Sequence, residues 1–226
     1  MVALPHIKTK EELVSLVNEI GYLPFITNEL TGFSVMELTD RTSWFTDDYE
    51  TDPWYWRSQI AGERTLVYAK LFSGRAGFVS REWYPLFANY RRNGYDFDTL
   101  FEAGAAPRRQ KLIMDLFPGC ENIPSYVIKK LCGFGKDGEK GFEGALTALQ
   151  MQTYLVISGF SRRRNKKGFE YGWAYGEYAT PEALFGTEHV TSLYGCEPAD
   201  SFAVILERCS HLNPGISREA LLKFLR

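Results

Sequence analysis

The first hundred residues contain one clear helical pattern and one clear hairpin pattern. Apolar residues recur every three or four positions between residues 10 and 20, Thr9 precedes them as a helix cap, and Gly21 follows them as a stop. Residues 65–80 are rich in β-branched and aromatic side chains on both sides of a turn sequence at 73–75, which predicts two paired strands. The N-terminal half is therefore expected to mix helices with strands.

The second half shows three short helical patterns followed by a hairpin pattern. After the third helix comes a β-branched run, and a later run alternates aromatic residues with small or polar ones. The densest positive run of the chain, residues 162–168, falls between these two strands, where a hairpin tip belongs. Three short helices followed by a two-stranded wing predict a winged-helix module. We expect helices over 107–117, 124–132 and 141–150, and strands over 153–158 and 169–176.

A short linker sequence, Gly104-Ala105-Ala106-Pro107, places a domain boundary near residue 105. The expected fold class is α/β (α+β), built as one compact unit with three parts. Residues 1–105 form an aromatic-rich half, residues 106–180 the winged-helix module with its basic wing, and residues 181–226 a set of C-terminal helices. The last of these helices begins at Ser217 and is amphipathic, so its apolar face suits either closure of the core or a homodimer interface.

Composition excludes several classes of protein. The 226 residues carry 26 Lys and Arg against 28 Asp and Glu, so a polyanion would have to bind a local patch rather than the whole surface. Cys120, Cys132, Cys196 and Cys209 lack the spacing of metal ligands and are interpreted as reduced thiols. No signal peptide or apolar run of about 18 residues is present, so we expect a cytoplasmic protein with no membrane partner.

The basic wing is the first candidate site. Cations at a hairpin tip can lie along a phosphate backbone and release its condensed counterions. The alternative is a solvated hairpin whose charges keep a sheet edge soluble. The third helix offers Glu143, Thr147 and Gln150 but no Lys or Arg, so the wing rather than this helix is expected to contact DNA. The predicted phosphate-binding side chains are Arg162, Arg163, Arg164, Lys166 and Lys167.

A second candidate lies in the aromatic and acidic segment 40–57, which has no clear periodicity. Trp54, Trp56 and Arg57 could form a stacking platform for an extruded base. They could equally be one core tryptophan, one surface tryptophan and an ion-paired arginine. The carboxylates at positions 47, 48, 50 and 52 favour a solvated acidic turn over a cation site, and no metal or cofactor is predicted.

The third candidate is the pair Gln150 and Gln152, where the third helix meets the first wing strand. At a break from helix to strand, extended geometry would place both side chains on one face. Neutral amides cannot act as general acids or bases at pH 7, but they can orient a water molecule and stabilise developing charge. Glutamines that are exposed to solvent or that cap backbone groups are the commoner case.

Several of these segments carry a resemblance to a known family. They are residues 54–57, residues 77–80 with Trp83, residues 87–92, and residues 142–152 with the basic wing. The second half resembles the AlkZ or YcaQ winged-helix DNA glycosylases, and the whole chain is similar to bacterial proteins described as AlkZ-related. The resemblance implies excision of bulky alkylated bases without a metal, with Gln150 and Gln152 as the catalytic pair.

Two functional hypotheses remain open. The first is a DNA-binding protein of DNA-repair type, which could be a monofunctional glycosylase. The second is a non-enzymatic winged-helix module for protein interaction or regulation, in which the glutamines are structural. An enzyme needs Gln150, Gln152 and the aromatics of segment 54–57 to converge beside the wing. Glutamines buried under the core would count against it.

Overall fold

The computed structural model describes residues 4–46, 48–119 and 121–226. In chain order, the helices are α1 (Lys10–Ile20), α2 (Val35–Leu38), the 3-10 helix η1 (Arg41–Ser43), α3 (Pro53–Glu63), α4 (Tyr84–Arg92), α5 (Phe97–Glu102), α6 (Arg108–Met114), α7 (Ser125–Leu131), α8 (Phe142–Met151), α9 (Pro181–Phe185), α10 (Thr187–Val190), α11 (Pro198–Leu212) and α12 (Arg218–Leu225). The strands are β1 (Tyr22–Pro24), β2 (Val67–Phe72), β3 (Arg75–Val79), β4 (Ile123–Pro124), β5 (Val156–Arg164) and β6 (Glu170–Ala179). The expected mixture of helices and strands is confirmed.

The strands of the described residues form one six-stranded antiparallel sheet in the order β1-β3-β2-β5-β6-β4. Three strands come from before residue 105 and three from after it. The two sets meet where β2 pairs with β5, through the single register pair of Tyr68 with Ile157. The halves that the sequence separates at residue 105 therefore share one sheet.

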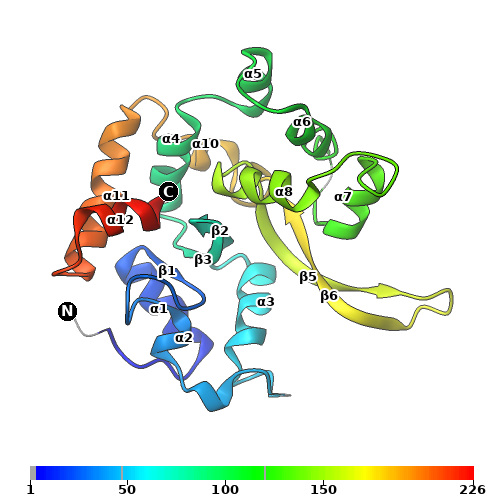
Figure 1. Ribbon diagram of the computed structural model, residues 1–226. Helices are drawn as coiled ribbons and strands as arrows, with labels where there is room; N and C mark the ends of the chain where they lie inside the picture. Colours follow the sequence, from blue (N-terminus) through cyan, green and yellow to red (C-terminus); the bar gives the residue numbers. More distant parts are fainter. Residues whose placement is uncertain (1–3, 47, 120) are drawn as a thin grey trace.

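The second half follows the order α6, β4, α7, α8, β5, β6. The short strand β4 pairs with β6 on the side away from β5, so the long hairpin has a third strand at its base. Burial along β5 falls outward, from 1% exposed at Val156 to exposed side chains from Arg162 onward. Figure 1 shows the outer part of the β5–β6 hairpin projecting well beyond the helices. The predicted three helices and hairpin are present. The predicted bounds of the first strand, 153–158, are wrong, because β5 runs from Val156 to Arg164 and the three arginines of the basic run therefore lie on the strand rather than at the tip.

The first predicted helix, α1, has the cap and the stop that its sequence predicts. Thr9 caps α1, with its hydroxyl accepting the N–H of Glu12 at 3.2 Å, and the Glu12 carboxylate accepts the N–H of Lys8 at 2.7 Å. Gly21 ends α1 at a φ of 97°, and the ring of Trp83 lies where a Cβ would stand. Position 21 accordingly requires glycine for both its backbone conformation and its close contact.

The sequence analysis did not predict α3. The aromatic segment 40–57 has no apolar periodicity, yet its end begins α3. Asp52 is the helix cap, because its carboxylate accepts the N–H of Trp54 at 2.8 Å, and Pro53 occupies the first helical turn. This Asp-Pro pair was the available signal for a helix start. The spacing of the aromatic residues showed no helical period, because α3 contacts neighbours on more than one side.

The apolar face of α12 closes the core. Phe224 is fully buried and its ring stacks on Phe72 of β2, with centroids 5.2 Å apart. The end of the helix is tied to the β2–β3 turn, since the N–H of Ser73 donates to the carbonyl of Arg226 at 2.9 Å. Of the two interpretations from sequence, core closure describes this face. A homodimer through other surfaces of the C-terminal helices stays a prediction.

Within the described residues, no helix combines the length and apolar character that crossing a membrane requires.

We expect Phe224→Ala to lower the free energy of unfolding by about 3–5 kcal/mol, because it removes a buried ring and leaves a cavity beside Phe72. Lys223→Ala, one position away on the exposed side, should change it by less than about 0.5 kcal/mol. Urea denaturation measures both. Equal effects of the two variants would show that α12 does not complete the core.

Candidate nucleic-acid interface

The hairpin tip is shaped by one asparagine. The side-chain oxygen of Asn165 accepts the N–H of Lys167 at 2.9 Å and that of Phe169 at 3.1 Å, and Gly168 takes a φ of 84°. This turn leaves the side chains on both sides of it in solvent. All five cations predicted to bind phosphate, Arg162, Arg163, Arg164, Lys166 and Lys167, are exposed.

Strand geometry divides these cations between two faces. Side chains alternate along a strand, so Arg162 and Arg164 share a face with Phe160, while Arg163 lies on the opposite face. The register agrees, because Arg164 is opposite Glu170 and the two form an exposed ion pair at 3.2 Å. Since exposed pairs contribute little, this contact leaves Arg164 available to a phosphate.

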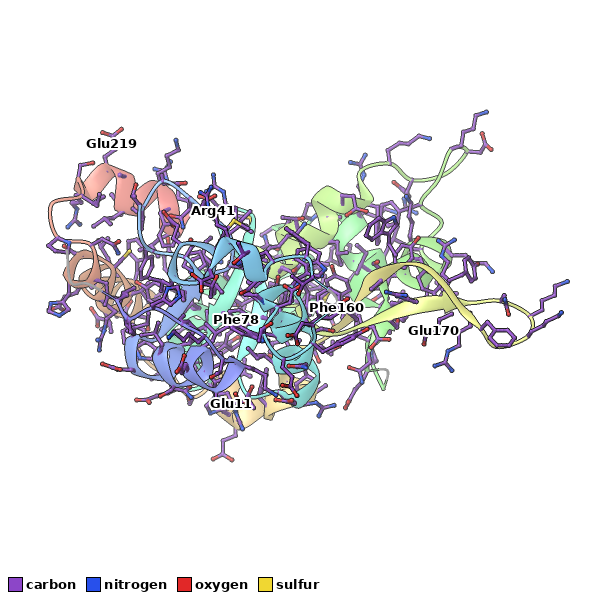
Figure 2. The ribbon with its side chains drawn as sticks, turned by 90° about the horizontal axis from the view of Figure 1, so that it is seen from below. Glu11, Arg41, Phe78, Phe160, Glu170 and Glu219 are labelled. Carbon is purple, nitrogen blue, oxygen red and sulfur yellow. The ribbon has the colours of Figure 1, made fainter. Side chains whose placement is uncertain are left out.

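On the first face, the base of the hairpin is joined to α3 by a stacked arginine. The Arg57 guanidinium lies 3.6 Å from the ring centroid of Trp54 and 4.1 Å from that of Phe160. Burial lowers the pKa of Arg57, although the nearby Tyr68 hydroxyl acts in the opposite direction. Figure 2 shows Phe160 at the base of the hairpin, beside α3, with Glu170 far out along it. Residues about a hundred positions apart therefore converge at the base of the hairpin.

This arrangement divides the predicted stacking platform. Trp56 is only 1% exposed, and its indole N–H donates to the carbonyl of Glu50 at 2.6 Å, so its ring is not available to a base. The Arg57 guanidinium lies against two rings, one from α3 and one from β5, which makes it a link between these elements. Trp54 is 38% exposed and is the member that a ligand can reach. The alternative of one core and one surface tryptophan describes the geometry, with ring stacking in place of an ion pair.

The acidic segment before α3 forms a turn and a helix cap. The Asp48 carboxylate accepts the N–H of Glu50 and the hydroxyl of Thr51, and these hydrogen bonds lower its pKa. The Asp52 carboxylate accepts the N–H of Thr46 as well as capping α3. Asp47 lies outside the described residues. The interpretation as a solvated acidic turn fits Asp48 and Glu50, which are exposed. It is wrong for Asp52, which is fully buried as the cap of α3.

Gln150 is fully buried, and both ends of its amide are engaged. Its oxygen accepts the N–H of Lys70 in β2 at 3.1 Å, and its nitrogen donates to the carbonyl of Leu146 at 3.1 Å. The reason lies in the sheet, where pairing of β2 with β5 stops after the pair formed by Tyr68 and Ile157. The next N–H of β2 that faces β5 would lack a partner, and Gln150 supplies one. This is the backbone-capping role.

Gln152 is in a different setting. The helix α8 runs to Met151 and Gln152 is its C-terminal cap, so the two glutamines belong to helical rather than extended backbone. Helical residues two positions apart point to different sides, which removes the shared face expected from the sequence. Gln152 is partly exposed, and its side-chain oxygen is buried with no hydrogen-bond partner among the described residues. The structure does not present the two amides together on one surface.

Two arginines that the sequence analysis gave no role are central to the same region. Arg91 donates to three carbonyls, those of Met151 at 2.6 Å, Leu71 at 2.6 Å and Leu225 at 3.0 Å. It thereby ties the end of α8 to β2 and to the end of α12. Burial lowers its pKa to about 10. An arginine at the end of an amphipathic helix is usually exposed, so nothing in the sequence marked this one as a donor to three carbonyls.

Arg92 is 3% exposed and holds the loop after α8. It donates to the hydroxyl and carbonyl of Thr153 and to the Tyr194 hydroxyl, and it forms an ion pair with Glu182. Burial acts to lower the pKa of Arg92, but the Glu182 carboxylate and the hydroxyls of Tyr84 and Tyr194 together outweigh it, and the pKa is raised. Thr153 has a φ of 66°, which β-branched residues rarely adopt, and these bonds hold it there. Arg92 and Glu182 line a cavity of about 390 Å³ that opens between α4, α5, α6 and α9.

Charge is distributed unevenly along the chain. Residues 106–180 contain 12 Lys and Arg against 7 Asp and Glu, within a protein that has 26 and 28 in total. This segment is therefore positive by 5, and the remainder of the chain is negative by 7. The overall charge of −2 conceals a positive module attached to an acidic body. A polyanion would be attracted to the module and repelled elsewhere.

Comparison with protein families gives a match over almost the whole chain, because the model of the family described as "AlkZ related" covers residues 7–226. The chain belongs to the AlkZ-related family. The resemblance drawn from the sequence is thereby confirmed at the level of the family. No curated protein and no solved structure matches this AlkZ-related chain.

In this AlkZ-related protein, we expect Gln150→Ala to lower the free energy of unfolding by about 1–3 kcal/mol, because it leaves the buried N–H of Lys70 without a partner. Gln152→Ala should lower it by less than about 1 kcal/mol, since the Gln152 oxygen has no partner to lose among the described residues. Chemical denaturation compares the two. Unchanged stability of Gln150→Ala would argue against the structural role.

Proposed function

We propose that this protein binds DNA along the projecting hairpin β5–β6, as a DNA-binding protein of DNA-repair type. The observation that carries the proposal is the set of five exposed cations on a hairpin that stands clear of the body. Each Lys or Arg placed at a phosphate releases counterions, so such a tip gains affinity in proportion to its contacts. Membership of the AlkZ-related family supports DNA as the polyanion.

The connectivity of the second half supports a winged-helix description. Its order is helix, strand, two helices and a hairpin, and the first short strand pairs with the last strand of the hairpin. In such modules one helix commonly enters the major groove. Here α8 is instead held against β2, through Gln150 and through the Lys70 amine, which donates to Thr147 at 3.2 Å. DNA contact is therefore assigned to the wing.

The proposal is one of binding and does not extend to hydrolysis by the glutamine pair. Gln150 has no free amide group with which to orient water, and Gln152 points elsewhere on the helix. Positioning of a nucleophile requires a group that can reach the reacting atom. A role for the module in protein interaction, which was the alternative from sequence, is retained as an outcome of the test.

The test compares binding of wild type and two charge-matched variants to a fluorescent 20-base-pair DNA duplex over a series of salt concentrations. The wing variant combines Arg162→Ala, Lys166→Ala and Lys167→Ala, which spares Arg163 with its ring contacts and Arg164 with its ion pair. The control combines Lys8→Ala, Arg41→Ala and Lys223→Ala, three exposed cations on other parts of the chain. We expect the slope of log affinity against log salt to fall by roughly 3 in the wing variant and to stay unchanged in the control.

Equal losses in both variants, or no binding of the wild type at low salt, would contradict the proposal. The second result would favour the protein-interaction module. A duplex with an alkylated purine, tested under the same conditions, shows whether the protein also releases the base. Release by the wild type that Gln152→Ala abolishes would show that the protein is more than a DNA-binding protein.

A further inference from the structure

We infer that the Arg163 face of the hairpin, together with Trp173, is a stacking surface for unpaired DNA bases. The inference rests on the proposed DNA-binding function and names the form of DNA that the hairpin prefers. Its basis is a series of exposed aromatic side chains along β6, which phosphate binding by the cations does not require.

The register places several aromatic rings on one face. Ser161 is opposite Tyr175 and Arg163 is opposite Tyr171, so these side chains share the face that carries Arg163. The backbone N–H of Asn165 donates to the carbonyl of Phe169 across the turn. Phe169 is two positions from Tyr171, so strand alternation places it on the same face. Exposure increases outward, from the partly buried Tyr175 to Tyr171 at 50% and Phe169 at 67%.

The inner end of this face already shows the contact that a base would make. The Arg163 guanidinium lies 4.8 Å from the ring centroid of Tyr126 in α7 and 5.0 Å from that of Tyr175. The two rings are themselves 5.1 Å apart. A planar cation is thus held against two rings at the base of the face. This arrangement anchors the face to α7, while the outer rings of Tyr171 and Phe169 stay exposed.

Trp173 is presented by an irregularity in the strand. Between the pairs Ser161–Tyr175 and Arg163–Tyr171, β5 has one intervening residue and β6 has three. Gly172 within this bulge has a φ of 74°, a conformation that suits glycine. The bulge leaves the indole of Trp173 89% exposed. Bulges of this kind re-aim a side chain, and here the result is the most exposed large hydrophobic side chain among the described residues.

The chemistry of the neighbours identifies the occupant. An apolar protein partner would be disfavoured by the cations that flank these rings, because their desolvation opposes burial. A single DNA strand satisfies both features, since its phosphates pair with the Lys and Arg side chains while its bases stack on the rings. The bases of an intact duplex are stacked inside it and present only their edges. The aromatic residues are therefore expected to select unpaired bases, whereas the cations serve either form of DNA.

The experiment measures the affinity of each variant for a 12-nucleotide oligothymidine and for a 12-base-pair duplex. Trp173→Ala and Tyr171→Ala should each weaken oligothymidine binding about five- to a hundredfold, with duplex binding changed less than about twofold. Tyr171→Phe should bind like the wild type, because stacking needs the ring and not the hydroxyl. Tyr49→Ala is the matched control, as it removes a ring that is 60% exposed and remote from β6 in the sequence.

The outcomes separate this inference from the proposal on which it rests. Loss of oligothymidine binding in the two ring variants alone supports the stacking surface. If both ring variants bind oligothymidine like the wild type while the wing variant loses both ligands, the inference is overturned and the proposal of DNA binding stands. Equal losses for duplex and oligothymidine overturn the preference for unpaired bases. Failure of the wild type to bind either ligand overturns both. Circular dichroism spectra that match the wild type show that the exposed substitutions leave the fold unchanged.

Discussion

The junction between β2 and β5 is the contact on which the rest of the structure depends, because it joins the two halves of the sheet. Direct strand pairing there is brief, with a single register pair. Side chains complete it, since Gln150 accepts the N–H of Lys70 and Arg91 bridges the carbonyls of Leu71 and Met151. A buried polar group that is hydrogen-bonded can stabilise such a junction, whereas a buried polar group without a partner would destabilise it. The β2–β5 junction thus determines where β5 leaves the core.

A hairpin anchored in this way can serve two purposes with the same two strands. Its inner part is sheet and core, where β5 is buried between α3, β2 and β6. Its outer part is a polar and aromatic surface with the solvent on both sides. The Arg57 guanidinium lies against Trp54 and Phe160 where the buried inner part of the hairpin meets its exposed outer part. Rigid support at the base would reduce the entropy lost when the tip orders on a ligand.

The sequence predicted the elements whose signals are local. Residues near one another in the chain determine these elements. They are the cap and stop of α1, the β2–β3 hairpin, the three helices of the second half and the exposed basic tip. It missed α3, where aromatic residues face several neighbours and only the pair Asp52 and Pro53 marked the helix start. Local patterns report a helix best when one face is apolar, and α3 lacks such a face.

Long-range geometry could not be predicted in this way. The interpretation of Gln150 and Gln152 assumed extended backbone, but α8 continues to Met151 and turns their side chains apart. The roles of Arg91 and Arg92 depend on carbonyls and a carboxylate that lie 20 to 134 positions away. Arg57 meets Phe160 only because β5 passes beside α3. In each case, the partner that decides the role of the side chain comes from another part of the chain.

Hydrogen–deuterium exchange with and without DNA tests the central claim most directly. The ligand is a short duplex with a single-stranded tail, which offers phosphates and unpaired bases together. We expect slower exchange over residues 160–176 on binding, with exchange in α11 and α12 unchanged. Protection confined to those C-terminal helices, with the hairpin exchanging as in the free protein, would contradict it.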